Sequence, residues 1–180
     1  FRPGSVVADD VSTHVAIRGD GFFSLQTADG EELFTRNGAF SVDGQGNMVT
    51  AQGHTLSEAI TIPEGATVNI SADGLVVTQI AGEDPQEVGR IQLRRFINPS
   101  GLEALGAGLY RANELSGQPQ LGNPGTEGLG ELMGGALESS NVDVAEELIG
   151  MIMAQRSYEL TSKAISTSDE ILKVTNRLKA

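Results

Sequence analysis

The sequence predicts a mixed α and β protein, in which an antiparallel β-rich body is followed by one long C-terminal amphipathic helix that forms coiled coils. Two observations lead to this prediction. From residue 14 to about residue 97 of the 180-residue chain, short apolar stretches are separated by glycine turns. Turns at intervals of about 8–12 residues are typical of antiparallel sandwiches and barrels. Residues 140–179 instead repeat their apolar side chains with the period of a helix.

Residues 1–13 predict an extended segment that leads into the antiparallel β body, which is expected over residues 14–97. Pairs such as Asn37-Gly38 and Asp43-Gly44, placed between alternating runs, are the strongest short-range hairpin signal. The expected strands are His14–Arg18, Phe22–Gln26, Glu32–Thr35, Ala39–Val42, Asn47–Thr50, His54–Ser57, Thr67–Ile70, Leu75–Gln79 and Glu87–Phe96.

Residues 98–138 predict an irregular connector packed on the body. Glycine, asparagine and proline are frequent there, whereas the recurring leucines argue against disorder. A short helical turn is expected near Gly101–Leu105.

The long helix is expected over residues 139–180, as part of an inner coiled-coil core. Ser140 and Asp143 have the spacing of a capping box, and Lys173 and Arg177 near the end complement the helix dipole. A helix of about 36 residues would be about 54 Å long, which is too long to lie on a small body without overhanging.

Apolar side chains recur every seven positions along this helix, whereas the set that would partner them in a two-stranded coil is mostly polar. One interpretation is a single amphipathic helix docked on the body, and the favoured one is a helix packed among several others. The residues expected at this assembly interface are Val144, Leu148, Met151, Ile152, Gln155, Tyr158, Ile165 and Leu172.

Composition limits the possible partners. The net charge is −12, and residues 1–142 hold 18 of the acidic but only 7 of the basic side chains, which argues against nucleic acid or an anionic membrane as a partner. The chain has no cysteine, so disulfides, thiolate zinc sites and cysteine nucleophiles are excluded. No apolar run approaches the ~18–20 residues of a membrane-spanning helix, so no direct membrane insertion is expected.

No catalytic residue, cofactor or metal site can be nominated, and the chain is not expected to be an enzyme. His14 and His54 have no ligand-like spacing, and the nucleophile-elbow, dinucleotide and Walker A motifs are absent. Asp43 begins a sequence that resembles a calcium loop, but Met48 and His54 occupy the positions that require glycine and glutamate.

Two other classes of protein remain as alternatives. Arg18-Gly19-Asp20 spells an integrin-binding tripeptide, which would suit an oligomeric adhesion or binding module, although a tight turn is the favoured reading. A secreted hydrolase that uses acidic residues of the body would leave the long helix unexplained.

Three stretches resemble the flagellar rod and hook family of axial proteins: residues 17–40 (IRGDGFFSLQTADGEELFTRNGAF), 96–109 (FINPSGLEALGAGL) and 137–172, with its "E-x-S-N-V" start and "M-I-x-x-Q-R-x-Y-E" centre. The segments NPSGLEALG and SKAIST favour the distal-rod branch, with hook and proximal rod proteins as alternatives. The residues of the family signature in the body are Gly19, Gly21, Phe22, Phe23, Thr35, Arg36, Gly38 and Phe40.

The resemblance implies a structural subunit of the flagellar basal body, exported unfolded by the type III apparatus, that polymerises helically into a hollow drive shaft. This shaft would run from the periplasm to the outer membrane and transmit motor torque to the hook. The implied partners are further copies of the chain, other rod proteins, the hook protein and the ring bushing. Family members pair the C-terminal helix with an N-terminal helix, which is expected to be lacking here, with residue 1 already in the linker to the body.

Overall fold

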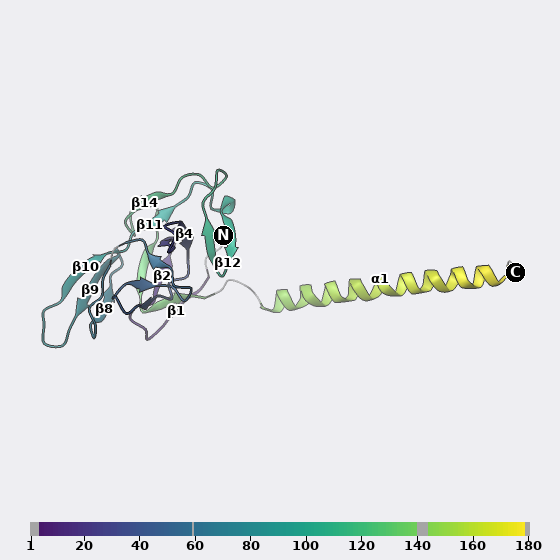
Figure 1. Cartoon of the computed structure of the whole chain (residues 1–180), viewed down its shortest axis with the longest axis horizontal. Coiled ribbons are helices and arrows are strands. Elements are labelled where there is room, and N and C mark those ends of the chain that lie inside the picture. The colour runs from purple at the N-terminus through teal and green to yellow at the C-terminus, as the bar shows by residue number, and fades with distance from the viewer. Residues whose placement is uncertain (1–3, 59, 140–143, 179–180) are drawn as a thin grey trace. The chain divides into compact units, whose positions relative to one another are not determined.

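The computed structural model describes residues 4–58, 60–139 and 144–178. The chain divides into two compact units, residues 1–140 and 141–180. The first unit is a β-rich body, and the described part of the second is the helix α1 (Val144–Leu178) (Figure 1). All the strand pairs within the described body are antiparallel. The predicted fold class, an antiparallel body followed by a long C-terminal helix, is confirmed.

The main sheet of the body has seven strands in the order β12-β13-β4-β3-β7-β6-β5. Its centre is the hairpin of β3 and β4, in which Phe23 pairs with Thr35 and Leu25 with Leu33. The strands are β3 (Phe23–Gln26), β4 (Glu32–Thr35), β5 (Ser41–Val42), β6 (Met48–Val49), β7 (Thr55–Leu56), β12 (Glu103–Gly106) and β13 (Leu109–Arg111).

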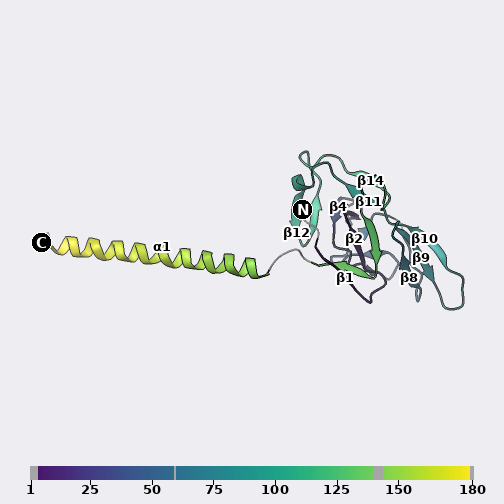
Figure 2. The same cartoon turned by 180° about the vertical axis from the view of Figure 1, so that it is seen from behind.

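The remaining strands form a three-stranded sheet, β10-β9-β8, and three separate pairs, β1-β16, β15-β2 and β11-β14. The three pairs join segments that are far apart in the sequence (Figure 2). The strands are β1 (Val6–Ala8), β2 (Val15–Arg18), β8 (Thr67–Ile70), β9 (Leu75–Gln79), β10 (Gln86–Arg90), β11 (Leu93–Arg95), β14 (Gln120–Gly122), β15 (Glu131–Gly134) and β16 (Ala136–Glu138).

The structure divides the long strand expected at Glu87–Phe96 into two. β10 pairs with β9, whereas β11 pairs with β14. Between them the buried Ile91 donates its backbone N–H to the carbonyl oxygen of Gly74, at 2.8 Å. The chain therefore changes sheets at Ile91, a step that the continuous apolar pattern hides.

Residues 98–138, expected to be irregular, contain five short strands, β12 to β16. Most of these pair with strands that lie much earlier in the chain, such as β2, β4 and β11. Partners so distant leave no periodic signal inside the segment. The helical turn expected near Gly101–Leu105 lies at Pro99–Gly101 instead, and Glu103–Gly106 is extended as β12.

Two apolar clusters fill the body, and the alternation of side chains along β4 separates them. Leu33 packs into the larger cluster with Phe23 and Leu25, whereas its neighbour Phe34 packs into a smaller cluster with Phe22 and Phe96. Successive side chains of a strand point to opposite faces of a sheet, so the main sheet is covered on both sides.

The smaller cluster is aromatic. The rings of Phe34 and Phe96 meet edge to face with centroids 4.8 Å apart, and Phe22 meets Phe96 at 5.7 Å and Tyr110 at 6.0 Å in the same manner. Such edge-to-face pairs contribute about 0.5–1.5 kcal/mol each beyond the area they bury. The cluster packs the segment around Phe96 against the main sheet.

Candidate functional site

The first and last strands of the body lie side by side. β1 pairs with β16 so that Val6 faces Glu138 and Ala8 faces Ala136, and the N–H of Ser139 donates to the carbonyl oxygen of Ser5 at 2.8 Å. We call this segment, residues 4–8 and 136–139, the neck. Every covalent path from the body to α1 runs through it, because α1 begins a few residues after Glu138.

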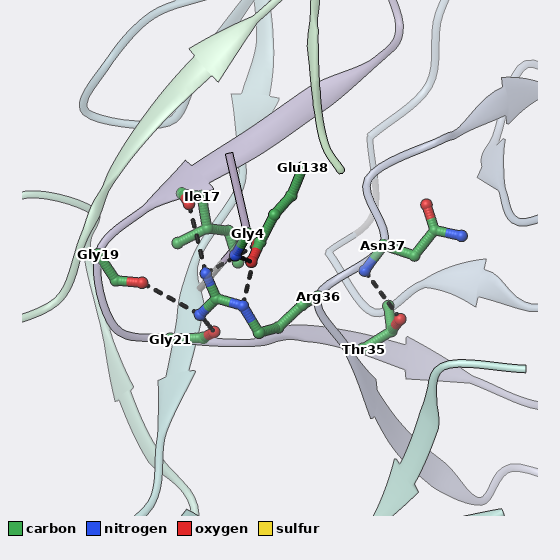
Figure 3. A network of polar contacts seen from close by, with 8 residues as sticks. All are labelled: Gly4, Ile17, Gly19, Gly21, Thr35, Arg36, Asn37 and Glu138. Carbon is green, nitrogen blue, oxygen red and sulfur yellow. Dashed lines mark hydrogen bonds and ion pairs between the residues drawn. The ribbon is translucent and has the colours of Figure 1, made fainter. Parts of the chain in front are cut away.

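A part-buried ion pair holds the neck to the body (Figure 3). Arg36 donates from Nε and Nη2 to Oε2 of Glu138, at 3.0 and 2.8 Å. The other oxygen of the same carboxylate, Oε1, accepts the backbone N–H of Gly4 at 2.8 Å. The two side chains are only 16% and 12% exposed. Glu138 thus links both arms of the neck to a single side chain of the body.

Arg36 also binds the turn between β2 and β3. Nη1 donates to the carbonyl oxygens of Gly19 and Gly21, at 3.0 and 2.9 Å, and Nη2 donates to that of Ile17 at 3.4 Å. These bonds and the two to Glu138 use all five N–H groups of the guanidinium. Lysine has neither the planar fork nor this number of donors.

The signature glycines allow this close packing. Gly19 and Gly21 have φ angles of 124° and 138°, which side chains rarely adopt, and a Cβ on Gly19 would lie 2.8 Å from the Cα of Gly130. At Gly38 a Cβ would lie 1.6 Å from the carbonyl oxygen of Val15. Glycine at these positions is therefore a requirement of the turn and of close backbone approach.

The other signature residues support the same region. The hydroxyl of Thr35 donates to the carbonyl oxygen of Gly108 at 2.8 Å and accepts the N–H of Asn37 at 3.0 Å. Phe23 and Phe40 meet edge to face in the large cluster, with ring centroids 5.3 Å apart, and Phe22 belongs to the aromatic cluster. The signature residues thus form and support the part of the body that holds Arg36.

A second polar network lies under the loop that follows β7. Arg94 is placed between two carboxylates, with its Nε 3.4 Å from Oε1 of Glu32 and its Nη1 3.4 Å from Oε1 of Glu58. Ser24 donates to Oε1 of Glu32 at 2.6 Å, while Oε2 of Glu58 is buried without a hydrogen-bond partner. Burial raises the pKa of Glu58 above its ordinary value. No motif in the sequence indicated this network.

The described residues contain no group of three or more His, Asp or Glu side chains that could hold a metal ion. Nδ1 of His14 lies 2.8 Å from Oδ2 of Asp9, and this hydrogen bond lowers the pKa of Asp9. Asp43 closes the hairpin of β5 and β6, since its Oδ1 accepts the N–H groups of Gln45 and Asn47, both at 2.8 Å. The hairpin turn expected at the calcium-like sequence is therefore present.

Arg18-Gly19-Asp20 forms the turn after β2. Its backbone is fixed by Arg36, and the N–H of Gly130 donates to the carbonyl oxygen of Asp20 at 2.7 Å. This geometry agrees with the prediction that the tripeptide forms a tight turn.

The second unit presents an apolar stripe along α1. Met151, Tyr158 and Ile165 are 65%, 77% and 61% exposed, at intervals of seven residues. Leu148, Ile152 and Gln155 are exposed as well. The side chains of Val144 and Leu172, and the capping pair of Ser140 and Asp143, lie outside the described residues. Among the described residues no helix combines the length and apolar character needed to cross a membrane.

The structure thus brings the body signature together around Arg36, whereas the expected interface residues lie on the separate helical unit. Glu138 and Gly4 were not among the predicted site residues. Glu138 is the charged residue of the "E-x-S-N-V" motif, but its partner is 102 positions away, and single-sequence reasoning cannot pair residues across such a distance.

Two family models match this chain. Residues 16–78 match the D1 domain of the flagellar hook protein FlgE/F/G, and residues 133–178 match the C-terminal segment of the flagellar basal body rod FlgEFG protein. Arg36 lies in the first matched segment and Glu138 in the second, so the ion pair joins the two. Together the antiparallel body, the neck and the exposed helix define a structural subunit of the flagellar axis.

Comparison with individual relatives shows which member of this class the chain resembles. The chain is 44% identical to the flagellar basal-body rod protein FlgG of Borreliella burgdorferi, over 99% of this chain and 69% of that protein. It is 41% identical to the FlgG of Caulobacter vibrioides, over 98% of the chain and 68% of the relative. The match to the hook protein FlgE of Salmonella typhimurium, 43% identical, covers 57% of this chain and 26% of that protein.

The chain belongs to the FlgG family of flagellar basal-body rod proteins. It is a structural subunit of the distal rod, and its place is the basal body of the bacterial flagellum.

Proposed function

We propose that the apolar stripe of α1 packs lengthwise against helices of neighbouring copies, and that this packing builds a hollow helical shaft that carries motor torque to the hook. The observation that carries the proposal is the exposure of Met151, Tyr158 and Ile165 at seven-residue intervals. Apolar area removed from water contributes about 25 cal/mol per Å². Most of the stability of a helix in a protein comes from the packing of its amphipathic face.

The neck transfers load between the helical core and the body. A three-residue strand pair such as β1-β16 is weak by itself. Arg36 ties this pair to the β2–β3 turn and therefore to the large core. A twisting load that enters through the neck is shared by many contacts and does not peel β1 from β16.

The role is mechanical and uses no catalytic residue, cofactor or metal. Other rod proteins and the hook protein are the neighbours along the axis, and the ring bushing faces the acidic surface of the body. The balance of 18 acidic to 7 basic side chains in residues 1–142 gives that surface a negative potential.

The test introduces a charge into the stripe of the full-length protein. Met151→Asp or Tyr158→Asp would bury an unpaired carboxylate at each helix contact, which costs several kcal/mol. We expect rods to be absent from electron micrographs and cells to be non-motile. The body should stay folded, because these residues belong to the other unit.

Lys163→Asp is the matched control. It introduces the same side chain into the same helix, at an exposed position outside the heptad stripe. Rods and motility should survive this change. Normal motility of both stripe variants would refute the proposed packing.

A further inference from the structure

A groove lies on the body beside the aromatic cluster. Its volume is about 330 Å³, and it is lined by the turn that contains Asp20 and by the segment that runs from Arg95 through Ile97 and Pro99 to Ser100. Ile97 is 79% exposed, although it follows the buried Phe96. The groove thus combines an exposed apolar side chain with a rigid aromatic base.

Arg95 gives the groove a cation that forms no ion pair among the described residues, although the carboxylate of Asp20 also lines the groove. Four other arginines of the described body, Arg36, Arg90, Arg94 and Arg111, form ion pairs with carboxylates. Arg95 is exposed, and its Nη1 donates only to the backbone carbonyl oxygen of Glu127, at 2.9 Å. Arg18 is also exposed and forms no ion pair among the described residues, but only Arg95 of the two lines the groove.

The turn between β9 and β10 carries acidic side chains and a proline, which complement the cation and the apolar side chain of the groove. Residues 81–87 are all exposed. Glu83, Asp84 and Glu87 form no ion pair among the described residues, and Pro85 stiffens the turn and offers an apolar ring. We call residues 81–87 the acidic turn.

The groove and the acidic turn lie on different parts of the body. The groove is bordered by the segment that joins β11 to β12, and Figures 1 and 2 show β12 and the β8–β10 sheet at opposite ends of the body. One molecule cannot join its own two ends, but two copies in succession can.

We propose that the acidic turn of one copy docks in the Arg95 groove of the next copy, with a carboxylate of Glu83 or Asp84 on Arg95 and Pro85 against Ile97. This contact rests on the proposed function and assigns to it a second interface, on the body. A contact between two different patches is heterologous and does not close on itself, so it extends into a filament. An exposed ion pair contributes little affinity; the contact fixes register, and the helix stripe supplies most of the binding.

Disulfide cross-linking tests this contact directly, because the chain has no cysteine of its own. The variant combines Asp84→Cys with Arg95→Cys in the full-length protein, and assembled rods are oxidised and run on a non-reducing gel. We expect a ladder of multimers, since each subunit contributes one cysteine to each neighbour. The control pair, Asp84→Cys with Asp29→Cys in the exposed β3–β4 turn, should stop at occasional dimers.

Charge exchange provides a second test without cysteines. Asp84→Arg and Arg95→Asp should each slow rod assembly several-fold, and the double variant should recover most of the wild-type rate. Rods that form normally but give neither a ladder nor this recovery would overturn the contact while leaving the proposed function intact.

Two further outcomes count against the contact. If the wild-type protein forms no rods, the proposed function fails and the contact fails with it. If Arg95→Cys cross-links in cells to a protein of different mass, the groove receives another rod component and the contact between copies is wrong.

Discussion

At the scale of single residues, the buried charged side chains differ in whether all their polar atoms have hydrogen-bond partners. Arg36 and Glu138 are both largely buried, but each is fully hydrogen-bonded, and a buried pair with complete partners is tolerated. Glu58 differs, because its Oε2 has no partner and Arg94 is shared with Glu32.

The pH dependence of stability should reveal Glu58. Its pKa in the folded body is raised by burial, above an ordinary value of 4.5. The folded state then binds the proton more tightly than the unfolded state, so the contribution of Glu58 is most favourable below 4.5 and is lost as the pH rises through the folded pKa. Relative to Glu58→Gln, the unfolding free energy of the wild type should increase as the pH falls from 7 to 4.

Urea denaturation of both proteins at several pH values measures this difference. The comparison with Glu58→Gln is needed because Asp9, Asp43 and Asp73 have lowered pKa values and act in the opposite direction. A difference that stays constant with pH would contradict the assignment.

At the scale of elements, the neck is a short strand pair that depends on a side chain from elsewhere. β1 and β16 pair over only three residues each, and the carboxylate of Glu138 binds Gly4 on one arm and Arg36 in the body. The ion pair is therefore expected to add to the stability that the ladder of this element provides.

Glu138→Gln should loosen the neck selectively. Loss of the negative charge leaves Arg36 part-buried without its counterion and should cost about 2 kcal/mol. In hydrogen exchange, the amides of β1 and β16 should lose protection while those of β3 and β4 keep theirs. Glu131→Gln, at an exposed position with no ion pair among the described residues, is the control and should cost less than about 0.5 kcal/mol. Equal loss of protection throughout the body would show that the pair is not local to the neck.

At the scale of the whole molecule, the two units are stabilised in different ways. The body has its own apolar clusters, whereas the described side chains of α1 are exposed from Leu148 to Ser168. The body is therefore expected to fold on its own contacts, while the helix depends on other copies.

Thermal unfolding followed by circular dichroism should separate these contributions. The helical signal should melt at a temperature that rises with protein concentration, because association stabilises it by mass action. The β signal should melt at a temperature that does not depend on concentration. Met151→Asp should remove the concentration dependence from the first transition and leave the second unchanged. A single transition at all concentrations would show that the two units do not unfold independently.

The sequence by itself determined the class of fold, the strands of the main hairpins and the long helix with its apolar stripe. These are local properties: an Asn-Gly or Asp-Gly turn, a period of two or a period of seven is recorded in neighbouring residues. The family signature was likewise visible as a run of residues, from Gly19 to Phe40.

Only the tertiary structure decided what that signature does. The partnership of Arg36 with Glu138, the strands hidden in residues 98–138 and the shared position of Arg94 all join segments far apart in the chain. Such pairs are selected by the packing of the whole body, which brings together backbones that carry no matching local pattern. The physical reason is that periodicity indicates which face of an element is buried. Which residues pack against that face depends on the fold of the whole body.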